Sequence, residues 1–155
     1  MSFRLVKPCV VPPLDEGFRP AVLANRAFQR QVQASGPGAP LVLGLERPDG
    51  SVSRFETEIL PQAEASLFYA ERLLKFLLWQ RGASKVYVGG PRSIGDHIKT
   101  SYAPGGTRAF DCHFMGNQIY GRPFAVIPCT AEEVPPERES ERPLDRHLDG
   151  YRIGF

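Results

Sequence analysis

Cysteine is scarce in this chain, and its scarcity sets the first limits on what the protein can be. The 155 residues contain only Cys9, Cys112 and Cys129, an odd number without a Cys-x-x-Cys spacing. Small disulfide-dependent domains carry denser and even sets of cysteines, and zinc ribbons need paired ligands at short spacing. The sequence therefore predicts neither a disulfide framework nor a zinc ribbon, and reduced thiols in a cytoplasmic protein fit it best.

Long apolar runs and blocks of like charge are also missing. The longest apolar stretch, Leu73 to Trp79, contains a lysine and is far shorter than the about 20 residues that a transmembrane helix needs. The N-terminal segment mixes basic residues and prolines where a signal peptide has its apolar core. Basic and acidic residues are spread evenly and leave a net charge of +2. We expect no membrane span, no export signal and no nucleic-acid partner.

What is present is the composition of an ordinary globular domain. Apolar residues make up 42% and charged residues 23% of the chain, whose length suits one compact domain with a tail. We expect residues 1–19 to be an extended, proline-punctuated lead-in and residues 20–129 to form an α/β domain. Residues 130–148 are dense in charge and proline, which predicts a linker. Residues 149–155 then read as the first strand of a following domain.

Turn signals and apolar periodicity predict the order of elements inside the domain. Pro48-Asp49-Gly50 is a strong reverse turn between two β-rich runs, which indicates an antiparallel hairpin. The helix after Pro61 is apolar around much of its circumference, so we expect it to be deeply packed, with Glu71 and Lys75 as a solvated i,i+4 pair. The expected elements are a helix over 20–35, strands over 41–47 and 52–59, a helix over 61–81, a strand over 85–90, a helix over 91–102 and a strand over 122–129.

This order predicts the fold class. Short strands connected by helices favour parallel pairing with the helices covering the sheet, and the hairpin adds an antiparallel pair. The chain is therefore expected to form an α/β fold with a mixed sheet, an antiparallel hairpin and helix-connected parallel strands. Residues 41–45 are apolar almost throughout, as in a central strand covered on both faces.

Gly89 and Gly90 stand between a strand and a helix, where phosphate-binding loops are found. A P-loop is excluded, because an aspartate and a histidine occupy the positions that need lysine and serine or threonine. One interpretation is a strand-to-helix turn that needs glycine for its backbone angles. The other is an anion or nucleotide contact at this cofactor-binding candidate, assisted by Arg92 and Ser93.

The segment FDCHFMG, residues 110–116, offers the candidates for catalysis. On a strand, Asp111 and His113 would share one face and Cys112 would point the other way. A carboxylate that orients a base is then conceivable, although no activated nucleophile is evident, and polar residues on a wet strand face are the simpler explanation. Metal binding by Cys112, His113 and His97 is not expected, since these residues lack clustered ligand spacing.

Aromatic residues recur on both sides of this segment, at Phe110, Phe114, Tyr120 and Phe124, and Trp79 is the single tryptophan. An aromatic row can stack against sugars or bases. Core packing is the simpler expectation, because each ring buries a large area when it enters a core.

The C-terminal stretch HLDGYRIGF carries a resemblance to a known family. It is similar to the strand that leads into an Asp-x-Gly phosphate loop in long ROK-type proteins (repressors, open reading frames and sugar kinases), and Tyr151 to Phe155 matches that strand. APLVLGLERPDGSVSRFET, ERLLKFLLWQRGASKVYVGGP and FMGNQIYGRPF are similar to the region that precedes the kinase-like domain in a long-form branch of the family.

The resemblance implies an N-terminal accessory or regulatory domain of a sugar-kinase-like transferase, inactive alone, whose partner is the following kinase-like domain or a homo-oligomer copy. ATP and Mg are implied only for the kinase domain, and no cofactor for this chain. The hairpin, helix, strand and helix also resemble a degenerate half of a ribonuclease-H-like fold, although Leu43-Gly44-Leu45-Glu46 replaces the expected Asp-x-Gly-x-Thr. A free-standing binding module for a small molecule or protein, or a small enzyme using Asp111 and His113, stays open as an alternative.

Overall fold

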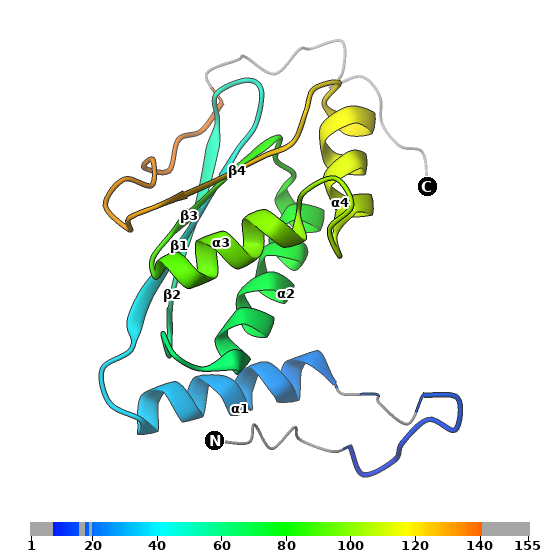
Figure 1. Cartoon of the computed structure of the whole chain (residues 1–155), viewed down its shortest axis with the longest axis vertical. Helices are drawn as coiled ribbons and strands as arrows, with labels where there is room; N and C mark the ends of the chain where they lie inside the picture. Colours follow the sequence, from blue (N-terminus) through cyan, green and yellow to red (C-terminus); the bar gives the residue numbers. More distant parts are fainter. Residues whose placement is uncertain (1–7, 16–17, 19, 141–155) are drawn as a thin grey trace, which may run out of the picture.

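A computed structural model describes residues 8–15, 18 and 20–140 of the chain. The predicted α/β class is confirmed, with a four-stranded mixed sheet and its hairpin, helix, strand, helix, strand order (Figure 1). None of the helices in this described part combines the length and apolarity of a membrane span. The elements are α1 Ala21–Ala34, β1 Ala39–Glu46, β2 Val52–Ile59, α2 Glu64–Arg81, β3 Lys85–Gly89, α3 Arg92–Ser101, α4 Ala109–His113, a π-helical turn η1 Phe114–Ile119, and β4 Ala125–Cys129.

The strands lie in the order β2-β1-β3-β4. β1 pairs antiparallel with β2, from Ala39 opposite Ile59, and antiparallel with β3, whereas β3 and β4 are parallel. β2 and β3 therefore run in the same direction with β1 between them, and α2 connects them across it. The all-apolar run of residues 41–45 is thus the central part of the sheet, as expected for a strand covered on both faces.

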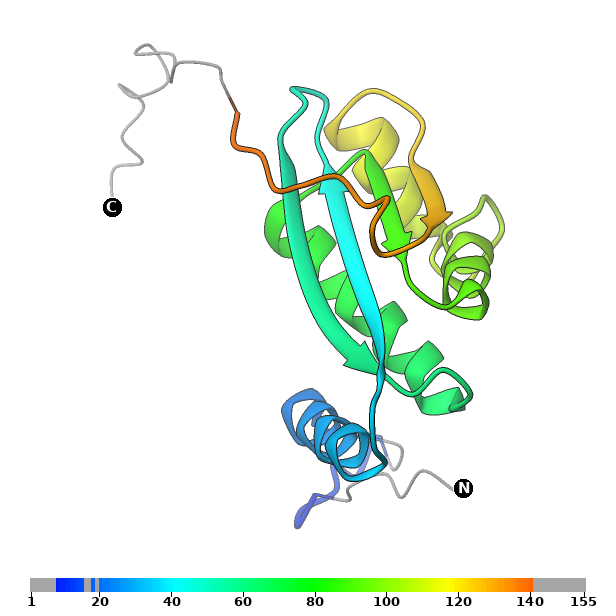
Figure 2. The ribbon, with the colours of Figure 1, turned by 90° about the vertical axis from the view of Figure 1, so that its left-hand side faces the viewer.

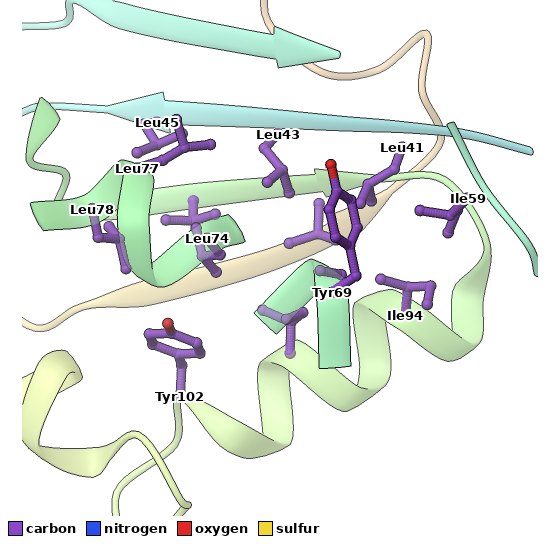
Figure 3. Close-up of a cluster of buried hydrophobic side chains, with 14 of the residues drawn as sticks. Leu41, Leu43, Leu45, Ile59, Tyr69, Leu74, Leu77, Leu78, Ile94 and Tyr102 are labelled. Carbon is purple, nitrogen blue, oxygen red and sulfur yellow. The ribbon is translucent and has the colours of Figure 1, made fainter. Parts of the chain in front are cut away.

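Helices α2, α3 and α4 lie on one side of the sheet and α1 lies across the end of the sheet, so that together they enclose the core (Figures 1 and 2). Leucines of β1 point toward α2, whose leucines fill the layer between the sheet and the helices (Figure 3). Burial of each such side chain stabilises the fold by roughly 1.5–3 kcal/mol. The central side chains, each almost fully buried, are Phe28, Leu41, Leu43, Leu45, Ile59, Leu74, Leu78, Val86, Val88, Ile94 and Ile98.

The expectation that residues 110–116 share strand faces is wrong. The chain is helical there, in α4 and then η1, so residues two apart point about 200° away from each other. Asp111 is accordingly buried, whereas His113 is exposed. The missed signal is the pair Phe110 and Phe114, whose i,i+4 spacing is helical and whose rings stack with centroids 5.9 Å apart.

The second face of the sheet is covered by residues 130–140, which we call the strap. In Figure 2 the strap crosses the sheet on the face opposite the helices. Val134 is 3% exposed there, and Arg138 forms an antiparallel bridge with Val52 on the free edge of β2. Packing thus continues to Arg138 and does not end at Cys129, where the charged composition suggested that a linker begins.

The strap docks because two glycines leave a notch for it. A Cβ atom added to Gly44 would lie 2.8 Å from Val134 Cγ1. A Cβ atom added to Gly89 would clash with Val134 Cγ2. Arg54 Nη1 donates to the backbone oxygen of Val134 at 2.7 Å. The part of the expected linker over 141–148, the expected strand 149–155, and most of the lead-in lie outside the described residues.

Candidate functional site

Gly89 and Gly90 have steric reasons to be glycine. Gly90 has φ +147°, and a Cβ added there would lie 2.6 Å from the backbone oxygen of Pro40 in β1. Gly89 is covered by Thr130, Ala131 and Val134 of the strap. The turn between β3 and α3 therefore needs glycine to let its neighbours approach, which is the simpler of the two interpretations.

The residues expected to assist an anion point into solvent. The Arg92 side chain is 92% exposed and lies 3.5 Å from the Asp96 carboxylate one turn later, and Ser93 is exposed as well. A carboxylate beside the guanidinium weakens any attraction to phosphate. The geometry at this helix end thus offers little to a nucleotide.

Asp111 and His113 lie in different surroundings. The Asp111 side chain is 3% exposed, accepts a hydrogen bond from Trp79 Nε1 at 2.9 Å, and lies 3.3 Å from Lys75 Nζ. His113 is exposed beside Asn117 and Gln118, at 3.1 Å and 3.2 Å from their amide nitrogens. The structure therefore does not bring the two residues together as a carboxylate and an oriented base.

The two groups of predicted site residues are also separated along α3. Gly89 and Gly90 precede its first residue, whereas Asp111 and His113 follow its last. The helix has 10 residues, which corresponds to about 15 Å. A single small-molecule site that uses all four residues is incompatible with this arrangement.

A polar cluster that the sequence did not reveal centres on Glu71 of α2. Arg108 Nε donates to Glu71 Oε1 at 2.6 Å, His97 Nε2 lies 2.9 Å from Oε2, and Ser101 Oγ donates to Oε2 at 3.3 Å. The Glu71 side chain is only 13% exposed. This carboxylate therefore joins α2 to α3 and to the loop before α4.

The expected solvated pair of Glu71 and Lys75 is wrong, because each residue has its own partner across the helix layer. Glu71, Lys75 and Trp79 are spaced by four residues on α2, so they form one stripe that faces α3 and α4. Lys75 and Trp79 both contact Asp111. The i,i+4,i+8 spacing was visible in the sequence, but the partners lie about 30 residues away and could not be read from it.

The electrostatics of the cluster favour an ionised Glu71. Burial pushes its pKa upward, but hydrogen bonds from Arg108 and His97 and their positive charge outweigh burial, so the pKa of Glu71 falls below its ordinary value. Because the folded pKa is the lower one, the stabilisation is complete above the unfolded pKa, near 4.3, and is lost as the pH falls through the folded pKa.

Tyr102 is the exception in this polar region. Its hydroxyl is buried and has no hydrogen-bond partner among the residues that the structure describes. Burial, and then the negative charge of Asp111, raise the pKa of Tyr102 above its ordinary value. Tyr102 is therefore a neutral phenol that contributes its ring, which packs against Phe124 at 5.9 Å between centroids.

The cluster has the chemistry of a structural joint. The carboxylates of Glu71 and Asp111 both accept hydrogen bonds from neighbouring side chains. None of the contacts described above joins His97 to a nucleophile. Among residues 8–15, 18 and 20–140, no three His, Cys, Asp or Glu side chains gather as metal ligands do.

A small depression between α1 and α2 is lined mainly by apolar side chains around Phe28, Phe68 and Arg72.

Aromatic rings stack on the outer side of the same helices. Trp79 and Phe114 have centroids 5.2 Å apart, and Phe110 stacks on the other side of Phe114. Phe110 is 69% and Trp79 48% exposed, so the expectation of core packing is wrong for these two rings. Phe114 and Phe124, by contrast, pack against the core as expected. We call Trp79, Phe110 and Phe114 the aromatic ridge.

The outward side of α2 extends this apolar surface. Phe76, one turn before Trp79, is 62% exposed, and Phe68 is 51% exposed with Arg72 stacked over its ring. The expectation that α2 is deeply packed thus holds for its sheet-facing side and is wrong for its outward side. The helix is apolar on both sides although the described residues cover only one.

No protein-family model matches the chain, and neither the curated proteins nor the solved structures contain a match. The resemblance to ROK-type proteins therefore depends on the quoted sequence stretches alone.

Proposed function

We propose that this chain is an accessory or regulatory domain of a ROK-type, sugar-kinase-like protein, and that it acts by packing against the kinase-like domain. The sequence stretches that resemble the family motivate the affiliation. The geometry supports a docking role over a catalytic one, because the buried carboxylates of Glu71 and Asp111 are occupied in joining helices.

The aromatic ridge is the observation that carries the proposal. A helix that is apolar around most of its circumference is normally buried over most of it, yet Phe76 is 62% and Trp79 48% exposed in the described structure. Stacked aromatic side chains are also the residues that dominate binding energy at protein interfaces. An exposed, contiguous apolar surface of this kind marks a place where another protein surface packs.

The coding sequence beyond Phe155 tests the affiliation. The proposal expects the reading frame to continue into an Asp-x-Gly loop and a kinase-like domain, with ATP and Mg bound there. A frame that continues into an unrelated sequence would refute the affiliation. Phosphotransfer by residues 1–155 alone, measured with ATP, Mg²⁺ and a panel of hexoses, would refute the noncatalytic role.

The docking role is tested in the protein encoded by the continued frame. Phe110→Asp places a charge on the ridge and should change the kcat/KM for sugar phosphorylation or separate the domains in scattering measurements. Leu23→Asp is the matched control, because Leu23 is a 40% exposed apolar residue on α1, away from the ridge. Equal effects of the two variants would show that the ridge has no special role.

The same ridge also favours a second candidate, a free-standing binding module that dimerises. A mass that rises with concentration for residues 1–155, and stays monomeric for Phe110→Asp, would support this module. The enzyme based on Asp111 and His113 receives no such support, since the two side chains have separate partners.

A further inference from the structure

The strap fixes where the chain leaves the domain. It runs from the end of β4 across β3 and β1, with Val134 in the notch of Gly44 and Gly89, to the free edge of β2. Val52 and Arg138 exchange both backbone hydrogen bonds, at 2.8 Å and 3.0 Å. The described chain therefore ends beside the start of β2, at the β1–β2 turn.

Contacts around this turn confirm the position of the exit. Hydrogen bonds from Ser51, and a further one from Ser140, lower the pKa of Asp49 to about 2. Asp49 is in the turn itself, and Ser140 is the last described residue. The chain that follows thus starts from the β1–β2 turn.

The aromatic ridge lies at this same end of the molecule. Arg47, at the end of β1, donates to the backbone oxygen of Arg81, the last residue of α2. Trp79 is two residues earlier on that helix, and Figures 1 and 2 show the β1–β2 turn and α4 at one end of the fold. The exit of the strap and the ridge therefore lie at the same end of the molecule, on opposite faces of the sheet, although Trp79 and Ser140 are far apart in sequence.

The segment that follows has the length and the composition to cover the ridge. Ten residues lie between Ser140 and Tyr151, and the eleven Cα–Cα steps of such a chain span up to about 36 Å when extended. In YRIGF the apolar residues alternate, so Tyr151, Ile153 and Phe155 would share one side of an extended segment and Arg152 would point away.

We propose that the aromatic ridge is the docking surface for the chain's own C-terminal segment, Leu148–Phe155, with Tyr151, Ile153 and Phe155 packed on Trp79, Phe110 and Phe114. This inference deepens the proposed function, because the same segment is the strand from which the kinase-like domain would begin. Its docking brings that domain against α2 and α4, beside the exposed Phe76 on the outward side of α2.

Trp79 is the single tryptophan of the protein, so its fluorescence reports this contact directly. The test compares acrylamide quenching in residues 1–155 with residues 1–140, which retain all the strands and helices that the structure describes, together with the strap. We expect the quenching constant of the longer chain to be lower by about half, because a ring that stacks on a partner loses solvent on that face. Equal constants in the two chains overturn the proposal.

Variants identify the occupant. Replacing Tyr151, Ile153 and Phe155 together by serine should raise quenching to the level of residues 1–140, whereas Arg152→Ser should leave it at the level of the full chain. Protection of Trp79 that appears only at high protein concentration would mean that a second copy occupies the ridge, which overturns the proposal. Quenching of Trp79 does not depend on the coding sequence after Phe155. The quenching test can therefore refute docking of the C-terminal segment while the kinase affiliation holds, and the coding sequence can refute the affiliation while the docking holds.

Discussion

The notch that holds the strap leads to a quantitative prediction about Gly44 and Val134. Val134→Ala removes two buried methyl groups, which should cost about 1.5 kcal/mol of unfolding free energy at about 0.8 kcal/mol per group. Gly44→Ala places a Cβ 2.8 Å from Val134 Cγ1 and should lift the valine from its site. Displacing the Val134 side chain from its buried site should cost roughly 1.5–3 kcal/mol of unfolding free energy. Replacing a glycine in a strand returns about 0.5–1 kcal/mol, so Gly44→Ala should have a net cost near 1–2 kcal/mol.

The double variant is the informative one. In Gly44→Ala/Val134→Ala the new methyl group occupies the space that Cγ1 leaves, so the cost should be close to that of Val134→Ala alone. The two substitutions should therefore be coupled by about 1–2 kcal/mol, well above the roughly 0.3–0.5 kcal/mol scatter of independent sites.

Urea unfolding followed by far-UV circular dichroism measures these energies, with equal m-values required for comparison. Val22→Ala serves as the control partner for Gly44→Ala, because Val22 is 59% exposed on α1 and should give additive energies. Additive energies for Gly44 and Val134 would refute the reasoning, since they would mean that the strap does not occupy the notch.

Three further predictions concern single side chains. Glu71→Gln should cost about 2 kcal/mol of unfolding free energy at pH 7, because charge-assisted hydrogen bonds are lost. In urea titrations the difference in unfolding free energy from the unchanged protein should disappear as the pH falls below about 4.5, and a difference that stays constant with pH argues against the ion pairs. Tyr102→Phe removes a hydroxyl without a described partner, so the urea midpoint should stay equal or rise, and a loss of more than about 1 kcal/mol would reveal a hidden hydrogen bond. Burial raises the thiol pKa of Cys112 and Cys129, so a disulfide reagent at pH 8 should label the exposed Cys9 first, and simultaneous labelling would contradict the described burial.

The elements of the fold could be predicted because their signals are local. Pro48-Asp49-Gly50 places the hairpin turn, and the apolar run of residues 41–45 correctly indicates a central strand. The same approach failed at residues 110–116, where the alternation of apolar and polar residues is compatible with a strand and with a helix. The i,i+4 stack of Phe110 and Phe114 is helical, but only packing against Trp79 shows which period applies.

The candidate site was predicted less well, because its contacts join distant parts of the chain. Glu71 meets His97 and Arg108, residues 26 and 37 positions away, and no local pattern specifies such a meeting. Whether Trp79 and Phe110 are core or surface also depends on which helix lies beside them, so the sequence alone suggested core.

Sequence by itself thus determined the α/β class and the order of the four strands and of the helices α1 to α3, since turn residues and apolar periodicity act within a few positions. Tertiary structure alone decided that a charged, proline-rich segment docks on the sheet. There, the buried side chain of Val134 occupies the space that is left because Gly44 and Gly89 have no side chain. The composition of a segment describes its average character and does not indicate a single contact of this kind.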